Sequence, residues 1–382
     1  MNYELTQEQG DFKKRFREFC DREISPRASE IESSVALLRE NCRRLAEGGF
    51  FTFLFPENNR DHPRSYQTSI LAWEELARSC PSTFLSSVLG SILTAVSIHR
   101  YGNQDQKELH LPPLTGGKKF GAFALTEPQA GSDLAGLNAS AIKEENTYVL
   151  NGVKAFAVNG PEADVALVFA SITPDSPLDR RLNAFLVEKG TPGFSSGPLL
   201  EKLGARGAPV SELRFENCPV PEEALLGGAG QGFEIARQMK EISRLGYAAY
   251  SLGIAQACLE EAVQYARKRQ AFGRPIAHFQ EISFKVADMQ MYVDTGRLLM
   301  CYAAWKLDEG LETGTDLSIA KLFLSEAATW CASTAVQIHG GYGFLKGSRV
   351  ERLYRDAKLG EIGEGTSEMQ RRIIARSLLG EG

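Results

Sequence analysis

TYVLNGVKAFAV, residues 147–158, is the stretch that decides the fold class of this chain. It is rich in β-branched and aromatic residues, and an Asn-Gly pair interrupts it. Runs of the same texture follow at residues 163–172, 182–190 and 211–220, with turn-forming residues between them. Short runs of this kind, separated by turns, are typical of strands. From about residue 118 to 225 the sequence therefore predicts an antiparallel barrel or sandwich.

The segments on both sides of this region have a helical pattern. Apolar residues recur every three or four positions before residue 115, and again in long segments from residue 233 to 340. This spacing predicts helices with one buried face. We therefore predict an α+β chain that is mostly α. Its parts are an N-terminal helical domain at 1–117, a central antiparallel β domain at 118–228 and a C-terminal helical bundle at 229–382.

Composition argues against several classes of protein. The net charge is -5 and the basic residues are spread along the chain, so no basic face for nucleic acid is expected. The N-terminus is polar, and no apolar run approaches the roughly 20 residues that span a bilayer, so no membrane association is expected. The seven cysteines never form CxxC, which favours free thiols and a cytoplasmic location.

Two glycine-containing motifs lie near the ends of the β-rich region. GGAGQG (Gly227–Gly232) resembles a phosphate-binding glycine loop. No βαβ unit is predicted around it, so an interdomain turn is the better interpretation. LTEPQAGSD (Leu125–Asp133) offers the hydroxyls of Thr126 and Ser132, and Gly131 would let backbone N–H groups approach a ligand. By itself this second motif is equally consistent with a polar loop that closes a strand.

RKRQAFGRPIAHFQ, residues 267–280, combines three side chains that suit a dinucleotide. The guanidinium of Arg269 can bind a pyrophosphate, the ring of Phe272 can pack on an adenine, and the amide of Gln280 can read a base edge. A basic helix end with a glycine stop is the commoner meaning of such a string.

QIHGGYGF, residues 337–344, ends a helix with the pair Gly340 and Gly341. The simplest interpretation is a glycine C-cap. The same exposed backbone amides could also bind a phosphate or a flavin.

IGEGTSEMQ contains the glutamate of greatest interest. Most glutamates in such loop-like stretches are solvated. Glu364 differs because it lies between Gly363 and Gly365, where a side chain can project into a cavity with little obstruction. A hydroxyl just after it can cap the last helix. No HxxxH or HExxH pair and no GxSxG elbow is present, so neither a metal site nor a serine nucleophile is expected.

Taken together and in this order, seven motifs resemble those of the acyl-CoA dehydrogenase family. They are LTEPQAGSD, YVLNGVKAF, KLGARG, RQAFGRPIAHFQ, QIHGGYG, YRDAK and IGEGTSEMQ, and the resemblance covers almost the whole chain. It implies the family fold, which is an N-terminal helical domain, a central β domain and a C-terminal four-helix bundle. It also implies a flavoprotein with FAD, usually a homotetramer in which neighbouring subunits complete the cofactor sites.

Carried over position by position, the resemblance implies one catalytic residue and two sets of binding residues. Glu364 matches the family's catalytic base. The cofactor-binding positions are Phe123, Leu125, Thr126, Gly131, Ser132, Phe156, Ala157, Val158, Arg269, Phe272, Gln280, Gln337, Gly340, Gly341, Thr366 and Glu368. Of these, the stretch 337–341 would come from an adjacent subunit. The substrate-binding positions are Ser132, Glu241, Arg244 and Gly365.

The implied reaction is trans α,β-desaturation of an acyl-CoA thioester. Removal of the α-proton places enolate-like charge on the carbonyl, and a hydride leaves the β-carbon for flavin N5. An electron-transferring flavoprotein would then accept the electrons. Some family members place the base immediately before the arginine that is Arg244 here. That position is Ser243, which cannot act as a carboxylate base, so Glu364 is favoured.

Three positions depart from the family pattern. PENNRDHPRSY, residues 56–66, stands where a Tyr-Gly-Gly string is frequent, which predicts a reshaped loop near the substrate entrance. Phe156 and Val158 replace a tryptophan and a threonine, so Val158 cannot give the flavin a side-chain hydrogen bond. Gly363 replaces a tyrosine that is common before the base in straight-chain enzymes, which predicts an enlarged cavity.

Other functions stay open at this point. An enlarged cavity favours a branched, cyclic or carrier-bound acyl group, so a dehydrogenase of acyl- or peptidyl-carrier-protein thioesters is the main alternative. A flavin monooxygenase or oxidase on the same fold is opposed by Glu364, which a hydroxylating flavin does not need. A catalytically silent nucleic-acid-associated protein is opposed by the acidic charge balance.

Overall fold

The structure is a computed structural model that describes residues 5–52, 54–55, 65–173 and 176–380. Helices form the N-terminal part of the chain. They are α1 (Gln7–Phe19), α2 (Val35–Glu47), α3 (Tyr66–Ser79), α4 (Pro81–Phe84), α5 (Leu93–Tyr101) and α6 (Gln104–Thr115). Most of the loop expected to be reshaped, at residues 56–64, lies outside the described residues.

One helical stretch of the described chain, Pro81–Tyr101, is long and apolar enough to cross a membrane, which differs from the expectation drawn from the sequence. It consists of α4, a π-helical segment Leu85–Ile92 and α5. Its apolar window is buried in its entirety, and it packs against α8 and the first strand. A helix that is apolar on all sides and covered by its own chain is typical of a protein core.

The middle of the chain forms one eight-stranded sheet. Its strands are β1 (Gly121–Ala124), β2 (Ser140–Glu144), β3 (Thr147–Val158), β4 (Val165–Ser171), β5 (Leu182–Glu188), β6 (Phe194–Ser196), β7 (Val210–Pro221) and β8 (Leu225–Leu226), with a short helix α7 (Leu178–Arg181) before β5. The strand order is β6-β7-β3-β2-β4-β5-β8, and β1 pairs with β4. Most pairs are antiparallel, as expected, but β1 and β2 each run parallel to β4, and neither is joined to it by a hairpin.

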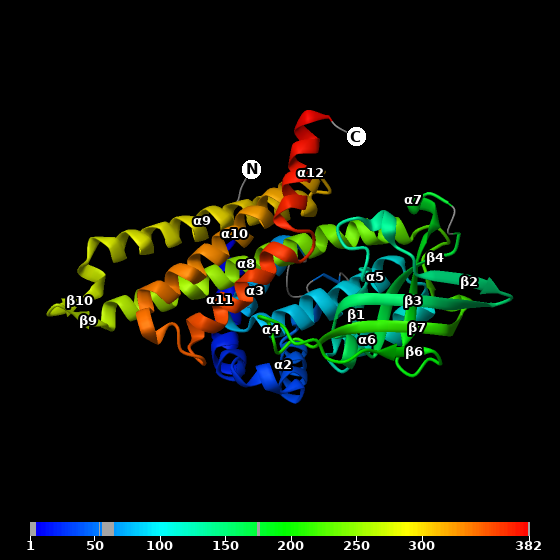
Figure 1. Ribbon diagram of the computed structural model, residues 1–382, viewed down its shortest axis with the longest axis horizontal. Coiled ribbons are helices and arrows are strands. Elements are labelled where there is room, and N and C mark those ends of the chain that lie inside the picture. Colours follow the sequence, from blue (N-terminus) through cyan, green and yellow to red (C-terminus); the bar gives the residue numbers. More distant parts are fainter. Residues whose placement is uncertain (1–4, 53, 56–64, 174–175, 381–382) are drawn as a thin grey trace.

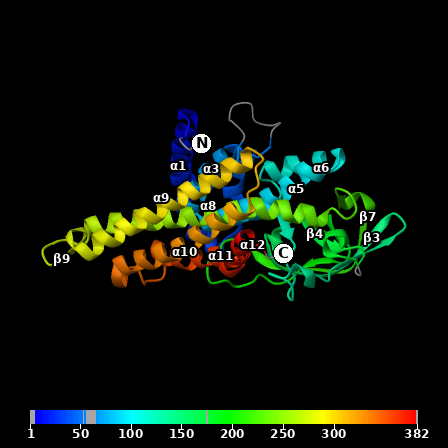
Figure 2. The same ribbon diagram turned by 90° about the horizontal axis from the view of Figure 1, so that it is seen from above.

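The C-terminal part is again helical. Its elements are α8 (Gly232–Lys268), β9 (Gln270–Ala271), β10 (Arg274–Pro275), α9 (Gln280–Asp308), α10 (Gly314–His339), α11 (Arg349–Ile362) and α12 (Ser367–Leu379). The helix α8 runs from the sheet to the β9–β10 hairpin at the far end of the molecule, with α9 and α10 beside it (Figures 1 and 2). The expected fold class is therefore confirmed.

The glycine motif before α8 is the turn that the sequence suggested. Gly227 and Gly230 have φ values of 71° and 80°, which side chains disfavour. The N–H of Gly230 donates to Asn183 Oδ1 at 2.6 Å, so the turn is tied to β5 of the sheet. GGAGQG thus joins the sheet to the bundle and does not form a dinucleotide loop.

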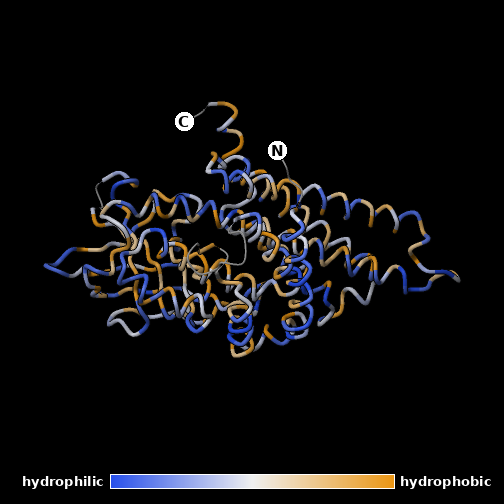
Figure 3. The backbone as a smooth tube through the Cα atoms, turned by 180° about the vertical axis from the view of Figure 1, so that it is seen from behind, coloured by the Kyte–Doolittle hydropathy of each residue, from blue (hydrophilic) through white to orange (hydrophobic). Residues whose placement is uncertain are grey.

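The last helix is only partly covered by its own chain. Figure 1 shows α12 projecting from the bundle, and Figure 3 shows hydrophobic residues near its end. Leu378 and Leu379 there are 77% and 71% exposed. Exposed apolar side chains grouped at one end of a helix are a feature of surfaces that meet another chain.

Candidate active site

Glu364 lies in the short turn between α11 and α12. Its φ of 53° is in the left-handed region, which residues other than glycine rarely adopt. Gln370 Nε2 donates to the carbonyl oxygens of Glu364 and Gly365 at 3.0 Å each, and Lys321 Nζ donates to that of Gly365 at 2.6 Å. Thr366 caps α12 with its hydroxyl. Side chains from α10 and α12 therefore fix the backbone of the turn.

The carboxylate of Glu364 is half buried and incompletely paired. Its Oε1 is buried without a hydrogen-bond partner among the described residues, as is Nε of Arg244. Burial lowers the pKa of Lys321 to about 8, although the Glu364 carboxylate acts in the opposite direction. Unpaired buried polar groups are rare in native structures, and a bound ligand is one of their ordinary explanations.

Tyr247 of α8 fills the space beside Gly363, which corrects the expectation of an enlarged cavity. A Cβ atom on Gly363 would lie 2.2 Å from the Tyr247 hydroxyl oxygen and 2.3 Å from Cζ. The side chain is buried, and burial together with the Glu364 carboxylate raises the pKa of its hydroxyl. The volume that the glycine leaves is therefore occupied by a phenol ring from another helix.

The loop at Leu125–Asp133 is anchored by a buried ion pair. Lys154 Nζ lies 2.6 Å from Glu127 Oε1 and donates to the Leu125 carbonyl oxygen at 3.1 Å. The same carboxylate accepts from the backbone N–H groups of Asn138 and Ala139. Burial lowers the pKa of Lys154 to about 8, although Glu127 opposes that shift. These contacts hold the start of the loop against β3 and tie it to the segment that leads into β2.

Beside this loop, Phe156 is presented to solvent by an irregular part of β3. The pairing of β3 with β7 shifts register between Lys154 and Ala157, and Phe156 has a φ of 55°. Its side chain is 68% exposed, whereas Ala157 is buried. A bulge that turns a large aromatic residue outward in a strained conformation is a common feature of ligand sites.

The other expected cofactor positions of the sheet region differ in exposure. Phe123 is half buried and packs on Phe169, with ring centroids 5.1 Å apart, while Leu125 is buried. Gly131 and Ser132 are exposed at the tip of the loop. Two more positions, Thr126 and Val158, are half buried. The structure thus offers one aromatic side chain and a polar loop tip to a ligand on this face.

The expected substrate positions on α8 lie one turn apart. Glu241 is half buried and pairs with Arg237 at 2.9 Å, and Arg244 is half buried. Ser243, the position of the family's alternative base, is buried. Glu368, in the first turn of α12, is exposed.

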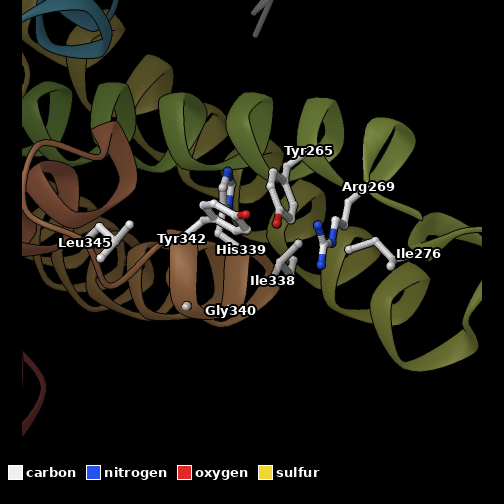
Figure 4. Close-up of a pocket in the computed structure, with 9 residues that line it drawn as sticks. Tyr265, Arg269, Ile276, Ile338, His339, Gly340, Tyr342 and Leu345 are labelled. Atoms are coloured by element: carbon white, nitrogen blue, oxygen red, sulfur yellow. The ribbon is translucent and has the colours of Figure 1, made fainter. Parts of the chain in front are cut away.

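The remaining expected positions lie at the other end of α8, in and around a separate pocket. The pocket is about 470 Å³ in volume and is lined by Tyr265, Arg269, Ile276, Ile338, His339, Gly340, Gly341, Tyr342 and Leu345. Figure 4 shows Arg269 from the end of α8 facing the end of α10. The Arg269 guanidinium lies 5.7 Å from the centre of the Tyr342 ring. Arg269 and the glycine pair of the same chain therefore line one pocket.

This pocket presents groups that suit a phosphate. Gly340 ends α10 with a φ of 58°, as the C-cap interpretation required, and no atom lies within 4 Å of the position of a Cβ on either Gly340 or Gly341. Open backbone beside an arginine is a common anion site. Phe272, 93% exposed, and the exposed Gln280 and Gln337 do not line the pocket.

Tyr247, Lys321 and the Lys154–Glu127 pair were not identified from the sequence. Lys321 lies in the apolar run LSIAKLF, and a single lysine there is a signal of a buried, partnered cation. Lys154 and Glu127 lie inside quoted motifs, but nothing local shows that they meet. Tyr247 lies in an ordinary apolar helix and gives no signal.

Among the described residues, no group of His, Cys, Asp and Glu is arranged to hold a metal ion. All seven cysteines are free. The region around Glu364 offers a carboxylate with Lys321 and Arg244 nearby, and the sheet offers an exposed aromatic residue and a polar loop.

Three family models match the chain in consecutive segments. They are described as acyl-CoA dehydrogenase N-terminal domain, middle domain and C-terminal domain, and they match residues 6–118, 122–218 and 230–379. Together they span nearly all of the chain.

Individual relatives agree with these models over their full length. An acyl-CoA dehydrogenase of Bacillus subtilis is 44% identical, with 98% of this chain and 99% of the relative covered. An acryloyl-CoA reductase (NADH) of Anaerotignum propionicum is 40% identical over 99% of this chain and 96% of its own. The solved structure of butyryl-CoA dehydrogenase from Megasphaera elsdenii is 39% identical with a TM-score of 0.91, covering 99% of this chain and 100% of that one.

Proposed function

Because the chain belongs to the acyl-CoA dehydrogenase family, we propose that Glu364 removes the α-proton of an acyl-CoA thioester. The protein is an oxidoreductase that acts on CH–CH bonds, with FAD as its cofactor. The observation that carries the assignment of the base is the Glu364 carboxylate, which has a buried oxygen without a partner on a turn fixed by other side chains.

The residues present fit FAD. The outward-facing ring of Phe156 and the polar loop tip at Gly131 and Ser132 suit the flavin end, and Arg269 with the open glycine pair at 340–341 suits the pyrophosphate. FAD, when bound, supplies the two-electron acceptor that the desaturation requires. We propose that Thr366 and the stretch 156–158 complete its binding site.

The remaining chemistry is carried by side chains of the chain. Glu364 accepts the α-proton. Hydrogen bonds from Lys321 and Gln370 fix the backbone of its turn and so keep the carboxylate in place. The backbone N–H of Glu364 is the donor that we propose for the thioester oxygen, where negative charge develops. Arg244, whose Nε is buried and has no hydrogen-bond partner in the described part of the chain, is a second candidate for a polar contact with the substrate.

We propose that a complete site takes residues from two copies of the chain. Arg244 and Arg269 are 25 positions apart on and just beyond α8, which corresponds to about 38 Å along a helix. One molecule of FAD cannot contact the Glu364 turn and the Arg269 pocket of the same chain over that distance. The exposed rings of Phe272 and Phe344, 93% and 84% accessible, lie near the pocket end and suit contact with another subunit. We propose a homo-oligomer, and a tetramer is the family's usual form.

Mixed oligomers test this arrangement. Glu364→Gln and Arg269→Ala chains are each expected to be impaired alone. If each site takes Glu364 from one copy and Arg269 from another, co-expressed chains form some sites with both native residues, and activity returns. If the mixture is no more active than the sum of the two variants, each chain builds its own site.

One panel of thioester substrates tests both the acyl carrier and the direction of the reaction. Anaerobic bleaching of the flavin by saturated acyl-CoA and acyl-carrier-protein thioesters reports which carrier is used. We expect the CoA esters to react, with an electron-transferring flavoprotein as acceptor, and a cytoplasmic location. A relative named acryloyl-CoA reductase makes the reverse reaction the second candidate, which oxidation of the reduced protein by an enoyl-CoA would reveal. Protein without bound FAD would overturn the whole assignment.

A further inference from the structure

Tyr247 and position 363 compete for one volume beside the base. A Cβ on Gly363 would lie 2.2 Å, 2.3 Å and 2.4 Å from three atoms of Tyr247, and all three belong to the distal half of the ring. Gly363 has a φ of -67°, which any residue can adopt. The glycine is therefore required by the ring of Tyr247 and not by the backbone conformation of the turn.

The ring has little freedom to move away. It packs edge-on against Tyr250, with centroids 6.2 Å apart, and the hydroxyl of Tyr250 donates to the Asp356 carbonyl oxygen of α11 at 2.9 Å. Tyr250 is fully buried and is also in contact with Phe84. Tyr247 is thus the outermost member of a stack of rings whose base is fixed to two other helices.

The helix that carries Tyr247 is also fixed. A Cβ on Gly246 would meet Leu89 Cδ2 at 3.0 Å, so α8 is in close contact with the π-helical segment. On the α11 side, a Cβ on Gly360 would meet the Ser251 hydroxyl at 2.6 Å. Because close packing on two sides leaves no room for a shift of α8, Tyr247 acts as a rigid wall next to Glu364.

We propose that Tyr247 is the specificity-determining residue of this site and that it restricts the substrate to short acyl chains. The inference rests on the proposed role of Glu364, because the α-carbon must reach that carboxylate. On this proposal the acyl chain continues from the α-carbon past the base, toward the ring of Tyr247 that lies beside Gly363. A rigid ring there excludes additional methylene groups, and a pocket discriminates by volume when it cannot expand.

The kinetic test uses Tyr247→Ala with Tyr247→Phe as the matched control. On butyryl-, hexanoyl- and octanoyl-CoA the parent is expected to prefer the shortest chain. Tyr247→Ala should raise kcat/KM for octanoyl-CoA relative to butyryl-CoA by at least roughly tenfold, while Tyr247→Phe keeps the order of the parent because the ring remains. A parent that prefers octanoyl-CoA, or an unchanged order in Tyr247→Ala, would overturn the proposal.

A binding measurement separates this inference from the proposed function. Calorimetric titration with enoyl-CoA esters of the same three lengths reports the fit of the chain whether or not the protein oxidises a thioester. If the parent oxidises no thioester, the proposed function fails. The length dependence of the dissociation constant still decides whether Tyr247 limits the chain.

A stability cycle tests the packing itself. Gly363→Ala should lower the Tm of the parent, because the new methyl group collides with the ring. In the Tyr247→Ala background the same change should leave the Tm unchanged or raise it, since alanine suits this backbone and reduces the entropy of the unfolded chain. An equal loss of Tm in both backgrounds would show that the two positions do not compete, and it would contradict the proposal.

Discussion

The turn that carries Glu364 and the pocket that contains Arg269 differ in how completely one chain builds them. At the turn, Lys321 and Gln370 bind backbone carbonyl oxygens, and Tyr247 fills the neighbouring volume. At the pocket, Arg269 is exposed, and the positions beside the glycine pair at 340–341 are open. The first region is formed by contacts within the chain, whereas the second presents an exposed guanidinium, in contact with the Tyr342 ring, beside backbone that stands open to solvent.

The difference shows which step each region can perform without a partner. Positioning a base requires a fixed backbone and a controlled volume, and the chain supplies both by itself. Binding a long anionic cofactor requires groups at both of its ends. In one chain these groups lie far apart, near Arg244 within α8 and near Arg269 just beyond it. Substitutions at the two regions should therefore fail in different ways.

The largest effect is expected at the base. Glu364→Gln should lower kcat by about 10²–10⁴-fold, because general acid–base catalysis contributes about that much. Stopped-flow bleaching of the flavin and exchange of α-deuterium from a saturated thioester measure the loss. Glu361→Gln is the matched control, because that carboxylate lies three positions away and pairs with Lys358 at 2.6 Å. Equal rates for Glu364→Gln and the parent would mean that the base is misassigned.

The next largest effect is expected at the buried ion pair that anchors the loop Leu125–Asp133. Lys154→Met should lower the free energy of unfolding by about 3–5 kcal/mol, because it leaves the charge of Glu127 buried without its counter-ion. Urea unfolding measures the change. Lys143→Met, which breaks an exposed pair with Glu222 just after β7, should cost about 0–1 kcal/mol. Similar costs for the two variants would show that burial does not distinguish the pairs.

A smaller and different effect is expected at the pocket. Arg269→Ala should weaken FAD binding by roughly ten- to a hundredfold through the loss of charge-assisted hydrogen bonds. The free energy of unfolding of the FAD-free protein should barely change, because Arg269 is exposed. Arg267→Ala, two positions earlier and outside the pocket lining, is the control. If Arg269→Ala destabilises the FAD-free protein as much as Lys154→Met does, Arg269 supports the fold and the contrast between the pocket and the Glu364 turn is wrong.

The effect confined to the narrowest range of conditions is a pH dependence of stability at the turn. Burial lowers the pKa of Lys321 to about 8, whereas an unfolded lysine keeps its proton to about pH 10.4. Between these values the unfolded chain binds more protons than the folded one, so this lysine makes the free energy of unfolding rise with pH. At pH below 8 both states hold the proton and the contribution is flat. The difference in stability between the parent and Lys321→Met, measured by urea unfolding from pH 7 to pH 10, should show this slope. A constant difference would mean that Lys321 has an ordinary pKa.

Local pattern was sufficient for the architecture. The helical spacing before residue 115 and after residue 233, with the strand-like runs between them, predicted the order of helices, sheet and helices that the structure has. The turn at Gly227–Gly232 and the helix cap at Gly340 were also predicted, because a positive φ is a local requirement. The site residues carried over from the family motifs stay predictions, and the experiments above test them.

Contacts between distant parts of the chain were decided only by the tertiary structure. Gly363 suggested an open cavity, but Tyr247, more than a hundred positions earlier, occupies that volume. Lys154 and Glu127 are buried together although each is an ordinary charged residue in its own motif. Periodicity reports which face of a segment is buried, because it follows from the geometry of one helix or strand. It does not report which side chain from another segment fills that face, because packing is set by the three-dimensional neighbours. The sequence by itself therefore determined the fold class and singled out the glutamate between two glycines, while the tertiary structure decided how much room lies beside it.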